Sequence, residues 1–386
     1  MSRARELAIG DAIAALAAAG PPPADGPADT LPVEIYTDPA RHADELAVMR
    51  LRPVALAASS ELGEPGAFVT ARAAGVPVIA TRLADGTVAA MVNSCRHRGA
   101  TVEPRECGST RIFSCQFHGW SYELDGSLRS VAEPSTFSTV PIDGGLRELA
   151  VEERHGIVWV TVGVPAGNAL AVADWMGPEL DELVEGLGLA DMVAFTSTEF
   201  ALDCNWKMLT DGFLETYHLK YLHRNSIAPY FPSNLMVARS YEGTETHVGG
   251  ALPKNRLLQQ FAELPRDQWR ILDHLTMALV LVPGTVLQWQ AGHVELFSIR
   301  PHPTDPGRCT CRLTLLVPAD RLDEDELWKR NWERVCATIP GEDFRAAEDV
   351  QANIDAGAVT ELRLGGTERA IAAHLASLDR LLGASS

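Results

Sequence analysis

The pattern of hydrophobic and polar residues divides the chain into two parts of different character. From about residue 45 to 162, short apolar and β-branched runs are separated by turn signals such as Asp85-Gly86 and Asp125-Gly126. The clearest of these runs are Val76–Ala80, Val88–Val92, Ile112–Cys115 and Ile157–Val162. Short strands joined by tight turns predict a small β-domain over this part of the chain.

Longer elements follow a boundary rich in Gly and Pro at Gly163 to Gly167. The pattern predicts helices over about 174–187 and from Asn205 onward, and helical periodicity runs from Glu324 to Leu382. Strands are expected at about 193–203, 236–241, 277–282, 286–290, 293–299 and 309–317. Mixed helices and strands of this kind predict an α+β domain.

The first twenty residues have the pattern of an alanine-rich amphipathic helix, and residues 21–29 read as a Pro- and Asp-rich linker. Glu6 and Asp11 precede the apolar stretch from Ala12 to Ala19, where a signal peptide carries positive charge instead. We therefore expect a cytoplasmic protein. The expected segments are an N-terminal helix and linker (1–44), a β-domain (45–165) and an α+β domain (166–386).

Charge and cysteine content narrow the possible functions. The net charge of −18 disfavours nucleic acids and anionic membranes as partners, and no apolar run is long enough to span a bilayer. The seven cysteines are odd in number, and their spacing resembles no disulfide framework. Reduced thiols are expected, with metal ligation wherever a histidine lies nearby.

Two cysteine–histidine pairs form the first candidate metal site. Cys95-Arg96-His97 is followed after seventeen residues by Cys115-Gln116-Phe117-His118. Two thiolates and two imidazoles suit a single zinc ion, which is one interpretation. However, zinc sites of this composition usually pair Cys with Cys and His with His. One Cys and one His in each short segment suit a two-iron cluster, in which one iron takes both thiolates and the other both imidazoles.

The two segments SCRHRGA and CQFHGWSYELDG resemble the cluster-binding loops of Rieske proteins, and specifically of the α subunits of ring-hydroxylating oxygenases. The resemblance implies a [2Fe–2S] cluster held by Cys95, His97, Cys115 and His118. It also implies an N-terminal Rieske domain followed by a catalytic domain of the helix-grip type with a central antiparallel sheet. Cys107 and the pair Cys309 and Cys311 are interpreted as ordinary thiols outside any metal site.

A second candidate site lies in the segment NWKMLTDGFLETYHLKYLH, residues 205–223. On an ideal helix His218 and His223 point about 140° apart, so they face one metal only if the helix breaks between them. Asp211, Glu215 and His218 are spaced to share one helical stripe. Acids on such a stripe are costly if buried, which favours a functional reason for them.

This segment resembles the iron-binding stretch of the same oxygenases, in which two histidines and one distant aspartate hold Fe(II). The resemblance implies His218 and His223 as ligands, and Asp343 as the third by its spacing to Gln351. Glu342, Glu348 and Asp349 remain alternatives, because runs of acids are usually solvated helix faces. The 2-His-1-carboxylate set leaves positions open for O₂ and water.

Glu215 occupies the position that, in this family, bridges electron transfer between subunits. Many members carry Asp there, whereas oxygenases of carnitine and related quaternary amines carry Glu. Asp211, one turn earlier, is expected to extend the same polar network. The resemblance thus implies a catalytic role for Glu215 and Asp211 in a head-to-tail α3 homotrimer.

The implied activity is that of a terminal oxygenase in the catabolism of aromatic compounds. Electrons derived from NAD(P)H arrive through a ferredoxin, a flavin reductase or both, and O₂ is the co-substrate. The product is a hydroxylated carbon, a cis-diol, or the result of oxidative N- or O-dealkylation. A Rieske electron carrier without oxygenase activity and a zinc-stabilised binding module are the rival functions.

The segment from Leu275 to Phe297 is expected to supply strands that line the substrate pocket. The expected lining residues are Met277, Val280, Leu287, Trp289, Leu296 and Phe297, with His293 and Glu295 as polar exceptions. An apolar wall without an Arg or Lys pair favours a mostly apolar, aromatic substrate, with chloroacetanilide-type N-dealkylation as the best fit. The alternative is a quaternary ammonium compound such as carnitine or betaine, suggested by Glu215 and by possible cation–π contact with Trp289.

Overall fold

The computed structural model describes residues 1–20, 29–137 and 144–383. The predicted linker at 21–29 lies, apart from Asp29, outside the described residues. The chain forms two compact units, one of residues 49–172 and one of residues 1–48 together with 173–386. Each unit is described by itself below.

The regular elements of the unit of residues 49–172 are mostly short strands joined by loops. A seven-stranded antiparallel sheet has the order β2-β11-β10-β5-β4-β3-β6, and a second sheet has the order β7-β8-β9. Their bounds are Val54–Ala58 (β2), Ala67–Ala73 (β3), Val76–Arg82 (β4), Val88–Val92 (β5), Cys107–Ser109 (β6), Phe113–Ser114 (β7), Ser121–Tyr122 (β8), Leu128–Ser130 (β9), Glu148–Arg154 (β10) and Ile157–Thr161 (β11). Phe68, Ile79 and Phe113 belong to a buried core that also contains Cys95 and Cys115. The two candidate thiolates, Cys95 and Cys115, therefore lie against the apolar core of this unit.

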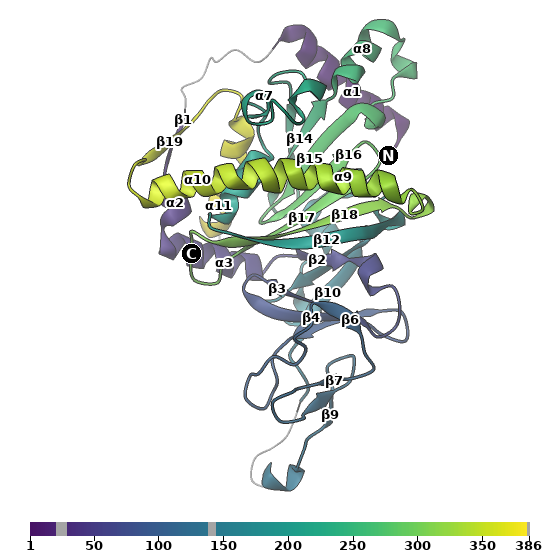
Figure 1. The fold of residues 1–386 in the computed structure, drawn as a ribbon, viewed down its shortest axis with the longest axis vertical. Helices are drawn as coiled ribbons and strands as arrows, with labels where there is room; N and C mark the ends of the chain where they lie inside the picture. The colour runs from purple at the N-terminus through teal and green to yellow at the C-terminus, as the bar shows by residue number, and fades with distance from the viewer. Residues whose placement is uncertain (21–28, 138–143, 384–386) are drawn as a thin grey trace. The chain divides into compact units, whose positions relative to one another are not determined.

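The other unit is organised around a seven-stranded antiparallel sheet of order β12-β18-β17-β16-β15-β14-β13 (Figure 1). The strands are Met192–Leu202 (β12), Val237–Glu242 (β13), Thr246–Pro253 (β14), Leu275–Leu281 (β15), Thr285–Gln290 (β16), Val294–Pro301 (β17) and Cys309–Pro318 (β18). A small second sheet pairs β1 (Asp29–Pro32) with β19 (Glu361–Leu364). Strands β15 and β17 are buried along their whole length, because helices and loops cover both of their faces.

Helices surround this sheet. They are Arg3–Ala19 (α1), Glu34–Thr37 (α2), Pro39–Arg50 (α3), Val172–Met176 (α4), Pro178–Gly186 (α5), Trp206–Gly212 (α6), Leu219–Leu222 (α7), Asn255–Glu263 (α8), Asp325–Thr338 (α9), Phe344–Asp355 (α10) and Arg369–Gly383 (α11). A π-helical turn, Ile339–Asp343, joins α9 to α10, so that both run as one rod across the sheet (Figure 1). None of the described helices combines the length and the apolar character that a membrane crossing needs.

These two architectures confirm the predicted α+β class, with a β-rich unit and a central antiparallel sheet. The long helical run predicted from Glu324 to Leu382 is wrong in part, because Gly357 and strand β19 interrupt it between α10 and α11. The helix predicted from Asn205 ends at Gly212. Asp211, Glu215 and His218 therefore do not share a helical stripe, and a turn carries the chain from Phe213 to α7.

Candidate metal centres

The four predicted cluster ligands lie on two loops with the same hydrogen-bond pattern. In the loop after β5, the Cys95 N–H donates to Ala100 O at 2.8 Å, and Gly99 N–H donates to Cys95 O at 2.9 Å. In the loop between β7 and β8, the Cys115 N–H donates to Trp120 O at 2.9 Å, and Gly119 N–H to Cys115 O at 3.0 Å. Gly99 and Gly119 both have left-handed φ angles, 77° and 70°, which glycine adopts without strain. Each loop thus holds one cysteine and one histidine in the same local geometry.

The donors of these loops fit a two-iron cluster better than a single zinc ion. The imidazoles of His97 and His118 lie side by side, with ring centroids 4.5 Å apart, while both cysteines are buried. The Nδ1 of His97 is buried and has no hydrogen-bond partner among the described residues. The ligand atoms of these four side chains do not gather at one point, as those of His218, His223 and Asp343 do. A cluster that separates its thiolates from its imidazoles accounts for this arrangement.

Two aromatic residues that sequence reasoning did not single out complete this site. Trp120 stacks on His97, with ring centroids 5.2 Å apart and an angle of 7° between the planes. The Tyr122 hydroxyl lies 3.2 Å from the Cys95 sulfur and accepts the Arg96 N–H at 3.0 Å. Burial and then the nearby charge of His118 lower the pKa of His97, which favours the neutral imidazole that a metal binds. Both aromatic residues stand in the motif GWSY, which is the signal that identifies them.

The structure brings His218, His223 and Asp343 together. One ligand atom from each lies within 4.8 Å of the others. The Asp343 Oδ1 is 3.1 Å from Nε2 of His223 and 3.5 Å from Nε2 of His218. The break in the predicted helix makes this possible, because His218 and His223 are the two end caps of the single-turn helix α7. Two imidazoles and one carboxylate oxygen on one point suit a mononuclear Fe(II).

Besides Asp343, each of the two histidines has a carboxylate of its own at Nδ1, the ring nitrogen that faces away from the metal position. Glu215 hydrogen-bonds to Nδ1 of His218, and Glu342 lies 2.6 Å from Nδ1 of His223. Because Nδ1 is engaged in both rings, Nε2 is left to face the metal position. Burial lowers the pKa of His223, but Asp343 and then Glu342 raise it more, so the net shift is upward.

The structure separates the four candidate acids near residue 343. Asp343 faces both histidines, and Glu342 binds the far side of one imidazole and the Ser226 hydroxyl. Glu348 accepts the backbone N–H of Asp203, and Asp349 is exposed. Of these four acids, only Asp343 is therefore positioned to be the third ligand of a metal held by His218 and His223.

Asp211 lies at the end of α6, half-buried and next to the same cavity. Its Oδ2 accepts the Tyr36 hydroxyl at 2.8 Å, and its Oδ1 is buried without a partner among the described residues. Burial raises the pKa of Asp211 to about 7, although Tyr36 and Lys207 oppose the shift. Asp211 does not contact Glu215 through any described hydrogen bond, so the predicted continuous network between them is not formed directly.

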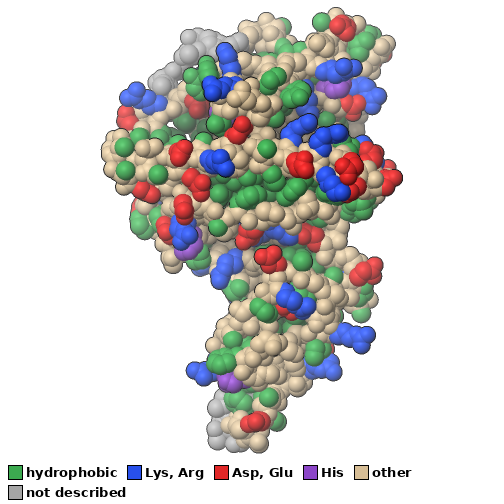
Figure 2. Space-filling model, in the orientation of Figure 1, with side chains coloured by type: hydrophobic (Ala, Val, Ile, Leu, Met, Phe, Trp, Pro, Cys, Tyr) green, Lys and Arg blue, Asp and Glu red, His purple; other side chains and the backbone are tan. Residues whose placement is uncertain are grey.

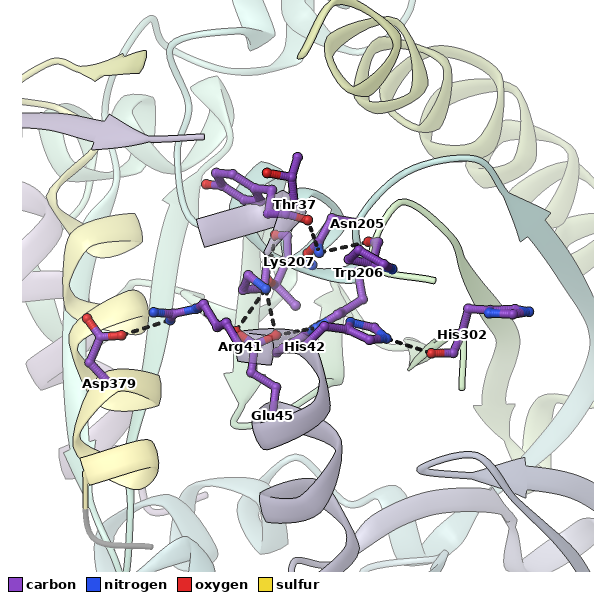
Figure 3. Close-up of polar contacts among 12 residues, drawn as sticks. Thr37, Arg41, His42, Glu45, Asn205, Trp206, Lys207, His302 and Asp379 are labelled. Carbon is purple, nitrogen blue, oxygen red and sulfur yellow. Dashed lines mark hydrogen bonds and ion pairs between the residues drawn. The ribbon is translucent and has the colours of Figure 1, made fainter. Parts of the chain in front are cut away.

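A buried ion pair between Lys207 and Glu45 anchors helix α6 (Figure 3). The Lys207 ammonium donates to both oxygens of Glu45, at 2.6 and 2.9 Å, and both side chains are 1% exposed. The Trp206 indole N–H also donates to Glu45, at 3.1 Å. Asn205 caps α6 by accepting the Lys207 N–H at 2.9 Å, and its amide donates to Tyr36 O at 2.8 Å. The Asn205-Trp206-Lys207 sequence therefore ties the helix to α2 and α3; Glu45 was missed because it lies 162 residues away.

A cavity of about 800 Å³ opens beside His218, His223 and Asp343. The six residues predicted to line it do not do so: Met277, Val280, Leu287, Trp289, Leu296 and Phe297 are all absent from its wall. Strand register explains most of this error. Met277 pairs with Trp289, and Leu287 with Leu296, which places these four on the face of the sheet away from the cavity. Phe297 shares the cavity face but lies behind Phe213, with ring centroids 4.8 Å apart.

The side chains of the sheet that do line the cavity are mostly polar. Ala278, Gln288 and Glu295 form one cross-strand row, and Thr276, Gln290 and His293 also face the cavity. Two cations, Lys254 and Arg334, complete this part of the wall. The predicted apolar wall is therefore wrong. The segment from Leu275 to Phe297 carries no Arg or Lys, as expected, but Lys254 and Arg334 reach the wall from other segments.

The remaining cysteines play no part in either centre. All seven are free. Cys107 is exposed on β6, and Cys309 and Cys311 are buried on β18. Burial raises the pKa of Cys311, and a hydrogen bond with Cys204 followed by burial raises that of Cys309, which keeps both as neutral thiols.

Comparison with known proteins agrees with both centres. A family model described as ring hydroxylating alpha subunit (catalytic domain) matches residues 189–384, and a Rieske [2Fe–2S] domain model matches residues 52–141. Among curated relatives, the large oxygenase component of naphthalene 1,2-dioxygenase from Pseudomonas aeruginosa is 31% identical over 44% of this chain and 38% of its own length. Chloroplastic choline monooxygenase from Beta vulgaris is 31% identical over 53% of this chain and 46% of its own length. The match thus spans less than half of either relative.

Solved structures share the fold at lower identity. A quaternary ammonium Rieske monooxygenase, CntA, in complex with an inhibitor superposes with a TM-score of 0.74 at 19% identity, over 91% of this chain and 95% of that one. Naphthalene 1,2-dioxygenase from Rhodococcus sp. bound to indole gives a TM-score of 0.73 at 16% identity, over 100% of both chains. Because the catalytic-domain model alone covers just over half of the sequence, the chain belongs to the family of ring-hydroxylating α subunits, with a Rieske [2Fe–2S] domain ahead of its catalytic domain.

Proposed function

We propose that this chain is the terminal oxygenase component of a Rieske non-haem iron system. In this proposal Cys95, His97, Cys115 and His118 hold the cluster, and His218, His223 and Asp343 hold the mononuclear iron. The observation that carries it is the convergence of two imidazoles and one carboxylate on a single point beside an 800 Å³ cavity. A Rieske cluster supplies electrons and a mononuclear Fe(II) with open positions activates O₂, so that an organic carbon is hydroxylated.

The residues of this chain contribute orientation and access. Glu215 and Glu342 fix the two imidazoles by holding Nδ1, which keeps both Nε2 atoms on the cavity side. Leu219, Leu222 and Ile227 line the cavity near the ligands and keep water from that end. Asp211 lines the same cavity, and since burial favours its neutral form, its proposed role is to hold a proton near the reacting substrate.

Glu215 is proposed to bridge electron transfer between two copies of the chain in a homotrimer. Its carboxylate already contacts the iron-ligating His218. On the outer surface nearby, Tyr217 and Tyr221 are 51% and 60% exposed and contact each other. On the cluster unit, His118 is exposed and its neighbour Phe117 is 59% exposed. Exposed aromatic residues next to both redox centres support docking between copies, and a ferredoxin or flavin reductase is the proposed electron source.

The substrate proposed from the sequence needs revision. A mostly apolar, aromatic substrate of the chloroacetanilide type rested on six side chains that do not line the cavity. The relatives do not choose between classes, since one is named for naphthalene and another for choline. We therefore propose hydroxylation or oxidative dealkylation of a small molecule with both an apolar and a polar part. The quaternary ammonium alternative retains the support of Glu215.

Metal analysis tests the proposal against its rivals. An oxygenase holds the two irons of the cluster and one mononuclear iron per chain. A Rieske carrier without oxygenase activity holds the cluster alone, and a zinc-stabilised binding module holds zinc. The purified chain should show a Rieske-type EPR signal after reduction. When electron-donor proteins and a panel of substrates are added, O₂ uptake should be coupled to product formation. A chain that contains zinc, or that contains the cluster alone, refutes the proposal.

A further inference from the structure

One end of the cavity carries charges that the metal centres do not use. We call it the polar end, and it consists of Lys254, Gln288, His293, Glu295 and Arg334. It is formed by strands β16 and β17, the residue that precedes α8, and helix α9. The iron ligands, by contrast, lie on α7 and at the start of α10.

Glu295 is the most informative residue of the polar end. It is only 4% exposed, and its Oε2 has no hydrogen-bond partner among the described residues. Its other oxygen lies 3.6 Å from Nε2 of His293, longer than a hydrogen bond. A buried carboxylate oxygen without a partner costs free energy, and a donor supplied by a ligand removes that cost.

The two cations of the polar end are also left without partners. Neither Lys254 nor Arg334 makes a side-chain hydrogen bond or ion pair with another described residue. Lys254 is half-buried; burial lowers its pKa, Glu295 raises it and Arg334 lowers it. The three charged groups therefore lie close enough to influence one another, yet they do not neutralise each other by direct contact. They offer one site for a cation and one for an anion.

The spacing along α9 and the π-helical turn separates the polar end from the iron ligands. Arg334 precedes Asp343 by nine residues, which corresponds to about 13 Å along a helical rod. The wall near the ligands carries the apolar side chains of Phe213, Leu219 and Leu222 beside the acids Asp211 and Glu215. A ligand that fills the cavity thus meets the unpaired charges of the polar end on one side and these apolar side chains on the other.

We propose that the polar end binds the charged head of an amino-acid-like zwitterion. The ammonium group donates hydrogen bonds to Glu295, and the carboxylate lies between Lys254 and Arg334. The apolar tail then points to His218, His223 and Asp343, so the carbon that reacts belongs to the tail. This inference rests on the proposed function, because it names the substrate class of the same cavity.

The test is a matched set of probes that share one aliphatic tail. 2-Aminooctanoate (aminooctanoate below) carries both charges at one end of its chain. Heptylamine carries only the cation, octanoate only the anion, and octanol neither. Binding to the protein with its iron and cluster is measured by calorimetry. Aminooctanoate should bind at least about tenfold more tightly than each of the others, since its ammonium and its carboxylate each gain an opposite charge at the polar end. Equal binding of the four probes, or binding by none, overturns the proposal.

Variants assign the two charges separately. Glu295→Gln should weaken aminooctanoate and heptylamine about tenfold and leave octanoate unchanged, whereas Lys254→Met should weaken aminooctanoate and octanoate and spare heptylamine. Glu263→Gln, an exposed change on α8 outside the cavity wall, is the control and should alter none of them. Unchanged affinities in Glu295→Gln contradict the ammonium site. Iron content and cluster spectrum are recorded on the same samples. If both metal centres are present but the four probes bind equally, only this inference is refuted. If the metal centres are missing, the proposed function is refuted.

Discussion

The carboxylate of Glu342 lies 2.6 Å from Nδ1 of His223, on the opposite side of the ring from the metal position. The next residue, Asp343, faces Nε2 of the same imidazole at 3.1 Å. Two adjacent acids at the π-helical turn therefore have different places in the proposed iron site, Glu342 behind the His223 ring and Asp343 on the side of the metal position.

The first prediction separates these two roles. Asp343→Ala should lose mononuclear iron, since a third of its protein ligands is removed. Glu342→Ala should retain iron but bind it about 10- to 100-fold more weakly, as is usual when the partner of a ligating histidine is removed. Iron titration followed by metal analysis measures both. Asp349→Ala is the control, because Asp349 is exposed on the same helix; loss of iron in this variant and not in Asp343→Ala means that the third ligand is misassigned.

The second prediction concerns the cluster. Cys115→Ser should bleach the visible spectrum and abolish the reduced EPR signal, because the buried thiolate at this position has no substitute nearby. Cys107→Ser is the matched control, since Cys107 is exposed on β6 and belongs to neither loop. A Cys115→Ser protein with a normal signal contradicts the ligand set.

The third prediction concerns Glu215. Glu215→Gln keeps a polar group beside His218 but removes the charge. It should preserve both metals and slow turnover strongly, because the proposed electron bridge between copies is interrupted. Single-turnover kinetics with a prereduced cluster measure the rate of electron arrival, and light scattering reports the oligomeric state. A wild-type protein that is fully active as a monomer contradicts the bridge.

The ligand-bearing loops and the His pair were predictable because each is a short segment whose residue types and spacing resemble the metal-binding motifs of one family. The pocket was not. A strand presents alternate residues to opposite faces, so an error of one position moves a side chain from the cavity to the far side. The register that places Glu295 beside Gln288 is set by pairing across three strands. Glu45, Lys254 and Arg334 reach their sites from distant segments, and no local pattern in the sequence indicates that convergence.

The fourth prediction is a pH effect on stability from Asp211. Burial raises its pKa from 3.8 to about 7 in the folded chain. Between these values the folded state holds a proton that the unfolded state releases, so stability falls as pH rises from about 4 to 7 and then levels off. Asp211→Asn lacks this slope. The difference in Tm between wild type and variant should therefore shrink or reverse over that range, whereas Asp323→Asn, an exposed control, should follow wild type.

The last prediction concerns the electron donor. The segment 95–129 contains five arginines, but two of them are engaged: Arg105 pairs with Glu103 at 2.7 Å, and Arg129 with Glu123 at 3.0 Å. Arg96, Arg98 and Arg111 are exposed. Acidic and basic side chains are interspersed on the face of this unit drawn in Figure 2. We expect these exposed arginines, which lie close in sequence to the cluster loops, to provide positive charge for docking an acidic ferredoxin.

Arg111→Glu should accordingly raise the apparent KM for ferredoxin several-fold and leave the cluster spectrum unchanged, because charge acts mainly on the rate of encounter. Arg105→Glu should raise it as well, but it also breaks the ion pair with Glu103, so Arg111 gives the cleaner measurement. Increasing salt should have the same effect in wild type, since the Debye length is about 8 Å at physiological ionic strength. Arg256→Glu, an exposed change on the catalytic unit, is the control. If neither Arg111→Glu nor salt alters KM, the donor docks elsewhere and these arginines act on the cluster alone.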